Sequence, residues 1–361
     1  MGLLALTTAP AVAADGGRHD ASGWTVPKCH TVAGDGSVTF TRDEGKRLVP
    51  TAQRLQPVAY TTALIALDQP DTLLAVSNNT LLTSGDAGCT WAAVGTVNGH
   101  FIQLTKAAGG AAYAWDLEGG ALAIVTPTGV KPLVSPTAQI AGLGTDPDDP
   151  LHVRLVNSSG GVYDSRDGGR TWMKSGTPAG SLTAGYAAAF DPSDPDHIVL
   201  GGMTTGARVT FDGGRSWTAS DGLSQVKGGK VNAFSLAVSP TTPDVVWAMG
   251  LDIAEMDSGA ASQGRHIYRS TDGGLTFAPV VDQSPSVILQ NGPVLVPHPS
   301  DPNVAYFVYG TYFQQFGTDI YRYDAGKGTV ATTHNSNDRV MSIAFNPAGD
   351  SVMYLGLAEE G

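Results

Sequence analysis

The sequence predicts an all-β protein, a seven-bladed β-propeller with four-stranded blades, and three observations lead to this prediction. An eight-residue turn motif recurs along the chain, a Pro- and Asp-rich turn recurs between its copies, and the strands at the two ends complement each other. The composition agrees, because the 361 residues include 46 Gly and 22 Pro and only 15% are charged. Short Val, Ala, Thr and Tyr runs broken by Gly, Pro, Asp and Asn are typical of all-β chains.

The repeated motif reads Ser or Thr, any residue, Asp, any residue, Gly, any residue, Thr or Ser, and an aromatic residue. Its clear copies are SGDAGCTW (84–91), SRDGGRTW (165–172), TFDGGRSW (210–217) and STDGGLTF (270–277), with weaker copies at 41–48 and 322–329. In a hairpin turn, the Asp carboxylate can accept backbone N–H groups while the Gly adopts a positive φ. The aromatic side chain then anchors the turn to the core. We therefore expect each motif to join two strands.

A second turn, rich in Pro and Asp as in AAFDPSDPDHIVLGG, separates two further strands, so each repeating unit contains four. The first strands of the units, which should lie nearest the axis, number seven: 61–68, 100–106, 139–146, 185–191, 233–239, 292–298 and 340–346. Their small residues suit strands that crowd around a tapering channel. Their spacing of roughly 40 to 60 residues fits the period of a propeller.

The two ends of the chain predict how the ring closes. The C-terminal SVMYLGLAEEG supplies the second strand of a blade, and the N-terminal VTFTRDEGKRLVPT supplies a third strand, a motif and a fourth strand. We therefore expect a 2+2 closure, in which N- and C-terminal strands complete the last blade and leave no free sheet edge. Residues 15–361 should form this single domain.

The N-terminus and the cysteines indicate a secreted, extracellular protein. Residues 1–14 resemble the remnant of a signal peptide, with cleavage expected after Ala13 or Ala14. The two cysteines, Cys29 and Cys89, suggest one disulfide in an exported chain, since Cys29 precedes the N-terminal strand and Cys89 lies in the motif of the adjacent blade. Two separate buried thiols are the alternative.

Charge and motifs argue against several classes of function. The formal net charge of −12 leaves no basic surface for nucleic acid or anionic membranes, and after residue 14 no apolar run approaches the ~20 residues that span a bilayer. HExxH, GxSxG and a Gly-rich phosphate loop are absent. We expect no catalytic residues, no metal and no cofactor. Hydrogen-bonded structural roles are expected for four histidines, His152, His197, His266 and His298.

The motif resembles that of the Asp-box (BNR) superfamily, which includes sialidases, sortilin-type receptors, some glucanases and secreted binding propellers. The resemblance covers residues 38–361 and implies the fold rather than an activity. A sialidase needs an Arg triad that begins with Arg-Ile-Pro on an inner strand, whereas the nearest string, RLVP at 47–50, falls on an outer strand. The resemblance implies structural turns at the rim for five aspartates: Asp43, Asp86, Asp167, Asp212 and Asp272.

Over its whole length, the chain is similar to a family of secreted actinobacterial propellers. Its members promote self-cleavage of a thermolysin-like neutral metalloprotease and donate glutamines to microbial transglutaminase. The resemblance implies a non-catalytic, monomeric binding protein whose partners are an extracellular metalloprotease and a transglutaminase.

Long loops predict where a partner binds. In a propeller, the loops that lead from the fourth strand of one blade to the first strand of the next blade lie on one face. The loops between the second and third strands of each blade lie on the same face. The long segments there are 251–266, 281–292 and 311–319. They carry residue types that are common at interfaces, namely Met256, Tyr312, Phe313 and Phe316. The alternative is that these side chains form local core at the end of a blade.

Transglutaminase substrates need glutamines on exposed, flexible backbone. Predicted loops and the segment after the N-terminal strand contain seven candidates: Gln53, Gln56, Gln263, Gln283, Gln290, Gln314 and Gln315.

An Asp-box glycoside hydrolase or glycan-binding propeller is the alternative function, and a scaffold without any link to proteolysis is a third. A hydrolase would need two loop carboxylates that face each other about 5 to 10 Å apart. The candidates are Asp116, Glu118, Asp252, Glu255, Asp257 and Asp319.

Overall fold

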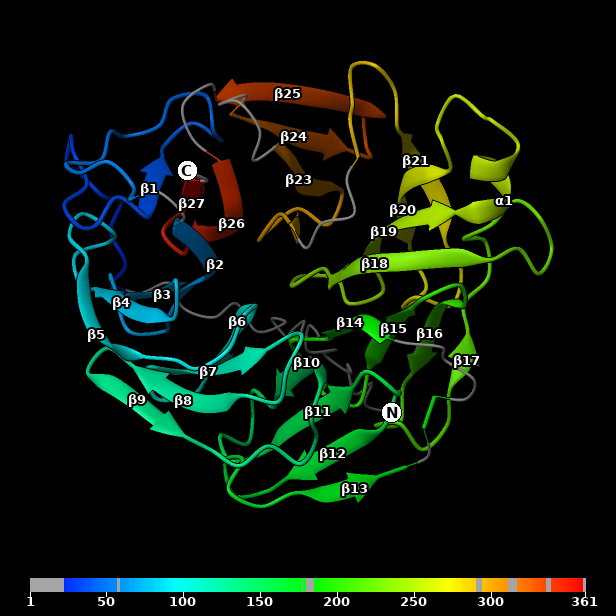
Figure 1. Cartoon of the computed structure of the whole chain (residues 1–361), viewed down its shortest axis with the longest axis horizontal. Coiled ribbons are helices and arrows are strands. Elements are labelled where there is room, and N and C mark those ends of the chain that lie inside the picture. Colours follow the sequence, from blue (N-terminus) through cyan, green and yellow to red (C-terminus); the bar gives the residue numbers. More distant parts are fainter. Residues whose placement is uncertain are drawn as a thin grey trace, which may run out of the picture.

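The computed structural model describes residues 23–56, 59–176, 178–179, 185–289, 294–310, 317–335 and 339–359. Antiparallel sheets surround a central axis, so the predicted all-β propeller is confirmed (Figure 1). The expected signal remnant at 1–14 lies outside the described residues.

Five sheets have four strands each, in chain order from the axis outward. The first two contain β6 (Ile102–Ala107), β7 (Ala111–Asp116), β8 (Leu122–Thr126) and β9 (Gly129–Pro132), and then β10 (Ile140–Thr145), β11 (Val153–Asn157), β12 (Val162–Ser165) and β13 (Met173–Ser175). The next contains β14 (Gly185–Phe190), β15 (Ile198–Gly202), β16 (Gly206–Thr210) and β17 (Thr218–Ala219). The last two contain β18 (Val231–Val238), β19 (Val246–Asp252), β20 (Arg265–Ser270) and β21 (Ala278–Asp282), and then β22 (Leu295–Pro297), β23 (Val304–Gly310), β24 (Thr318–Asp324) and β25 (Thr329–Asn335). One short helix, α1 (Ile253–Asp257), follows β19.

The remaining strands form one seven-stranded sheet. It contains β1 (Val38–Thr41), β2 (Ala59–Ala66), β3 (Leu73–Ser77), β4 (Thr80–Ser84), β5 (Ala92–Thr96), β26 (Arg339–Asn346) and β27 (Gly349–Glu359). Strand β26 pairs along one edge of β27. Along the other edge, β1 pairs with Met353–Gly356, and the start of β2 pairs with Ala358 and Glu359.

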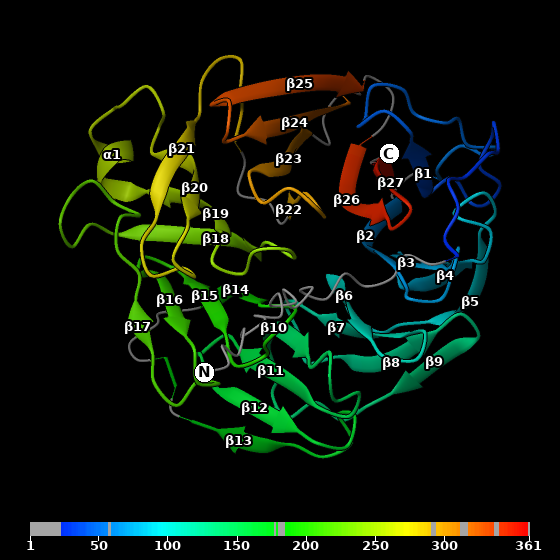
Figure 2. The same ribbon diagram turned by 180° about the vertical axis from the view of Figure 1, so that it is seen from behind.

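The prediction of seven separate four-stranded blades is therefore wrong, although every predicted inner strand overlaps an observed one. These strands follow one another around the axis in both views and are β2, β6, β10, β14, β18, β22 and β26 (Figures 1 and 2). The number of sheets differs because the eleven-residue β27 extends past β1 and also pairs with β2. The 2+2 closure is incomplete, since the expected fourth strand after β1 is an isolated bridge between Thr41 and Leu48.

Neighbouring sheets pack through their apolar faces. Trp247 of β19 and Phe307 of β23 are fully buried in one such interface. Phe40 of β1 and Tyr354 of β27 are fully buried in a cluster of the seven-stranded sheet and its flanking segments. Each large side chain that is removed from water stabilises the fold by about 1.5 to 3 kcal/mol. The core therefore consists of layers between sheets, which leaves the connecting loops free at the two ends of the ring.

The repeated motif forms the same turn at five hairpins. After β16, the Thr210 hydroxyl donates to Asp212 at 2.8 Å and accepts the backbone N–H of Gly214, while Asp212 accepts the backbone N–H of Ser216 at 2.9 Å. Equivalent hydrogen bonds surround four other aspartates, Asp43, Asp86, Asp167 and Asp272. The turn thus satisfies several of its own backbone donors, while a further N–H, such as that of Gly213 to the Asp196 carbonyl, bonds outside the motif.

The predicted disulfide between Cys29 and Cys89 is confirmed, with 5.8 Å between the two Cα atoms. It joins the segment before β1 to the turn after β4. The same segment forms a parallel bridge from Ala33 to Thr90 and another from Val32 to Thr51. The N-terminal segment is thus attached to the chain that follows β1, at Thr51, and to the turn after β4, at Cys89 and Thr90.

Replacing both cysteines with serine should lower the free energy of unfolding. The disulfide links residues 60 positions apart, and closing a loop of that length in the unfolded chain is worth about 4 kcal/mol. Urea unfolding of the double variant should show a midpoint at a lower urea concentration than that of the wild type, while the folded state should keep its function. A midpoint equal to that of the wild type would contradict this expectation.

Asp212→Asn should destabilise the protein in a pH-dependent way. Burial alone would raise the pKa of Asp212, but hydrogen bonds from Ser216 and Thr210 outweigh burial and lower this pKa to about 2. The carboxylate therefore stabilises the fold above its unfolded-state pKa of about 3.9, and this contribution is lost as the pH falls through 2. Thermal unfolding should show a less stable variant at pH 7 and a much smaller difference near pH 2. An equal difference at both pH values would argue against this role.

Candidate functional site

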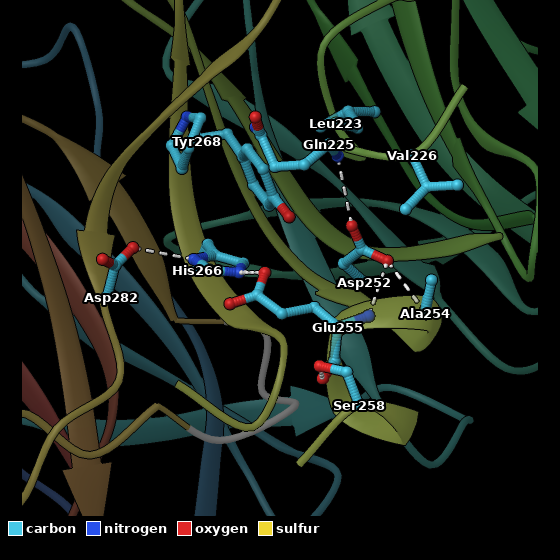
Figure 3. A pocket seen from close by; sticks show the side chains of 11 residues that line it. Leu223, Gln225, Val226, Asp252, Ala254, Glu255, Ser258, His266, Tyr268 and Asp282 are labelled. Atoms are coloured by element: carbon cyan, nitrogen blue, oxygen red, sulfur yellow. Dashed lines mark hydrogen bonds and ion pairs between the residues drawn. The ribbon is translucent and has the colours of Figure 1, made fainter. Parts of the chain in front are cut away.

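A cavity of about 380 Å³ lies where the β17–β18 connection meets the β19–β20 connection. These are the two kinds of connection that the sequence analysis assigned to the partner face. The polar part of the cavity wall comes mainly from Asp252, Glu255, His266, Tyr268 and Asp282 (Figure 3).

Asp252 joins the two connections. Its Oδ1 accepts the backbone N–H groups of Ala254 and Glu255 at 3.0 and 3.3 Å, which caps the N-terminus of α1. Its Oδ2 accepts the Ser224 hydroxyl at 2.7 Å and the Gln225 N–H at 3.3 Å. Because Asp252 is only 1% exposed and its oxygens receive four donors, it holds the wall of the cavity in place.

Asp116 has a similar position in another sheet. It ends β7 and accepts the backbone N–H groups of His100, Phe101 and Glu118. Asp116 and Asp252 therefore each lie at the end of the second strand of a sheet and hydrogen-bond to the segment that precedes the first strand of that sheet. What distinguishes Asp252 is the helix that follows it, which carries Glu255 into the cavity.

His266 lies between two carboxylates. Its Nε2 is 2.7 Å from Glu255 Oε2, and its Nδ1 is 2.8 Å from Asp282 Oδ1. Glu255 also accepts the hydroxyl of Ser262. The His266 side chain is 6% exposed, whereas those of Glu255 and Asp282 are 26% and 68% exposed. The predicted hydrogen-bonded role of His266 is confirmed, and His266 positions two acidic groups at the cavity.

Tyr268 directs its hydroxyl toward Asp252 and Glu255 (Figure 3). The residue is 1% exposed, and its hydroxyl has no hydrogen-bond partner in the part of the chain that the structure describes. Burial raises the pKa of Tyr268, and the charges of Asp252, Glu255 and Asp282 raise it further. The phenol is therefore neutral at physiological pH and keeps its donor and acceptor capacity.

The cavity brings together two of the loop carboxylates expected for a hydrolase, Asp252 and Glu255. It adds Asp282, which the sequence analysis missed because it ends a strand outside any motif. The Asp-x-x-Glu spacing of 252–255 could have identified α1, since an acidic cap with Glu three residues later is typical of a helix start. The other four carboxylates lie elsewhere: Asp116, Glu118, Asp257 and Asp319.

Of the predicted partner residues, Met256 lies on α1 and is 40% exposed. The other three, Tyr312, Phe313 and Phe316, lie outside the described residues.

The candidate glutamines fall into three groups. Three are exposed, Gln53, Gln56 and Gln263. Gln283 is half-buried, donates to Gln263 at 2.9 Å and accepts the backbone N–H of Leu289. Three lie outside the described residues, Gln290, Gln314 and Gln315.

Two of the remaining predicted histidines also have carboxylate partners. His152 contacts Asp146 and Asp164, both at 2.8 Å, and His197 contacts Asp191 at 3.2 Å. Within the described ranges, no group of three or more His, Cys, Asp or Glu is arranged to hold a metal ion. The same ranges contain no helix with the length and hydropathy needed to span a membrane.

Fold and site together define a disulfide-linked β-propeller with an acidic cavity among its loops. No protein-family model matches the chain. It is, however, 53% identical over 362 residues to the dispase autolysis-inducing protein of Streptomyces mobaraensis, a match that covers 99% of this chain and 95% of that protein. The chain belongs to the dispase autolysis-inducing protein family.

Solved structures with the same fold are more distant. YCF48 bound to D1 peptide has a TM-score of 0.57 and 14% identity, covering 84% of this chain and 95% of that chain. An ancestral GH74 enzyme has a TM-score of 0.53 at 16% identity, and the GH74 enzyme of Niastella koreensis has 0.51 at 18%. These cover 78% and 82% of this chain, which spans only 39% and 41% of the enzymes. At such identities, the likeness shows the fold alone.

Proposed function

We propose that the protein is a secreted, non-catalytic binding propeller that acts on an extracellular thermolysin-like metalloprotease and promotes its autolysis. The observation that carries the proposal is 53% identity, over nearly the whole chain, to a protein named for inducing the autolysis of dispase. The Cys29–Cys89 disulfide supports secretion, because such bonds persist in oxidising compartments.

A binding protein can promote self-cleavage without contributing a catalytic group. If it binds a locally opened form of the protease more tightly than the closed form, it increases the population of the opened form. Another protease molecule then cleaves the exposed segment. The loop face suits this role, since Met256 is exposed on α1 and the acidic cavity lies beside it.

The hydrolase alternative has one observation in its favour, the three carboxylates that line the cavity. Their hydrogen bonds favour another use. Both oxygens of Asp252 are occupied by donors of the surrounding loops, and Glu255 and Asp282 bind the same imidazole. This arrangement holds negative charge in place, so we propose binding rather than glycoside hydrolysis.

Incubation with a thermolysin-like protease tests the proposed function. Wild-type protein should accelerate the loss of the intact protease band on a gel, and Met256→Glu should weaken the effect about tenfold if Met256 contacts the protease. Met173→Glu is the matched control, because Met173 is 69% exposed on the outer strand β13. Intact, fully active protease after long incubation with the wild type would contradict the function. Equal effects of the two variants would contradict only the assigned face.

We also propose that the protein donates glutamines to transglutaminase. Labelling with a primary amine, followed by mass spectrometry, should modify the exposed Gln53, Gln56 or Gln263 well before Gln283. Gln283 is half-buried and both ends of its amide are hydrogen-bonded, to Gln263 and to Leu289, whereas Gln263 is exposed and accepts hydrogen bonds at its Oε1. Modification of Gln283 ahead of all three exposed glutamines would contradict this order, and label confined to glutamines other than the seven candidates would refute the assignment.

A further inference from the structure

We propose that the cavity beside α1 binds a cationic nitrogen group, an alkylammonium or guanidinium such as ends a lysine or arginine side chain. The inference concerns the cavity alone and does not depend on the proposed effect on a protease.

The cavity is lined by carboxylates that have no lysine or arginine partner in the described ranges of the chain. Asp252, Glu255 and Asp282 line it together. Among the described residues, His266 contacts both Glu255 and Asp282, and no lysine or arginine pairs with any of the three carboxylates. Carboxylates gathered in a partly buried cavity attract a cation more strongly than the same groups dispersed over the surface.

Two of these carboxylates retain free acceptor sites. Each carboxylate oxygen can accept about two hydrogen bonds. All such sites on Asp252 are occupied, whereas each oxygen of Glu255 has one hydrogen-bonding neighbour, the Ser262 hydroxyl or His266 Nε2. Oδ1 of Asp282 lies against His266 Nδ1, and within the described chain no donor reaches its Oδ2. Glu255 and Asp282 can therefore accept several N–H donors from a ligand.

The hydroxyl of Tyr268 is an independent indication of a ligand. Tyr268 lines the cavity, its hydroxyl points toward Asp252 and Glu255 (Figure 3), the residue is 1% exposed, and no described group hydrogen-bonds to the hydroxyl. Buried hydroxyl groups in folded proteins nearly always have a partner, so this one calls for a group that the chain does not supply. The N–H of a bound cation can donate to the phenol oxygen while its other N–H groups reach Glu255 and Asp282.

The remainder of the cavity suits an alkyl chain. Leu223, Val226, Ala254 and Pro279 line it in addition to the polar groups. A volume of about 380 Å³ is small for a ligand pocket, and it matches one extended side chain better than a large molecule. Lysine and arginine combine an apolar stem with a charged end, which is the combination that this cavity presents.

Calorimetric titration with agmatine, which carries a guanidinium and an ammonium group on one alkyl chain, tests the proposal. Wild-type protein should bind agmatine saturably, and the affinity should fall as salt is added. Glu255→Gln and Tyr268→Phe should each weaken binding about tenfold, since each removes one contact to a charged group. Tyr268→Phe should also keep the wild-type melting temperature, because the lost hydroxyl has no partner among the residues that the structure describes. Glu118→Gln is the control, which removes one exposed charge at another β-strand connection and should bind like the wild type.

Absence of binding at millimolar agmatine in the wild type, or equal affinity in all three variants, would overturn the proposal. A blocked tripeptide with a central arginine distinguishes the sources of the cation. Tighter binding of the peptide than of agmatine indicates a protein side chain, and the reverse indicates a small free amine, and either result supports the cavity's assignment. No protease is present in the agmatine titration. A negative titration therefore does not bear on the autolysis experiment, and a negative autolysis experiment does not bear on the titration.

Discussion

The pairing of β27 with three other strands is the constraint on which the rest of the structure depends. This strand receives β26 on one edge, and β1 and the start of β2 on the other. Since β1 and β27 come from opposite ends of the chain, their contact closes the ring and removes an edge that another chain could pair with. This pairing should make folding slow, because contacts between the two ends of the chain form only after a large loss of chain entropy.

The cavity lies at a different sheet, the one formed by β18–β21, and is fixed there by local hydrogen bonds. Its wall combines the segment that enters β18 with the connection between β19 and β20, and the four hydrogen bonds of Asp252 hold these parts together. The cavity therefore has the rigidity of the sheets on which its walls are built. Rigid placement of Glu255, Tyr268 and Asp282 lowers the entropic cost of binding a small charged group, because few side chains must be ordered at that moment.

Local chemistry explains which parts of the fold the sequence could predict. In a turn such as the one at Asp272, side chains of the motif bond to backbone groups of the same turn, so the motif is recognisable wherever it occurs. The inner strands were found for a similar reason, since they recur at a fixed distance from these turns. The pairing of β27 with β2 involves only two residue pairs far apart in the chain, and no local pattern encodes it. For that reason the predicted number of separate sheets was wrong.

The site was harder to predict than the fold. Asp252 and Glu255 could be named as loop carboxylates, but their positions depend on a helix in a segment expected to be a loop. Asp282 and Tyr268 lie in strands whose alternating pattern indicates only which face is buried. Their meeting at one cavity results from strand register and from the neighbouring connection, which are properties of the tertiary structure.

Hydrogen exchange in β1 tests the central claim most directly. If the ends of the chain close the ring, the β1 amides that pair with β27 should exchange as slowly as those of β27 and the inner strands, through global unfolding alone. Rapid exchange throughout Val38–Thr41 while the inner strands stay protected would show that the ring is stable without this contact, which would contradict the account.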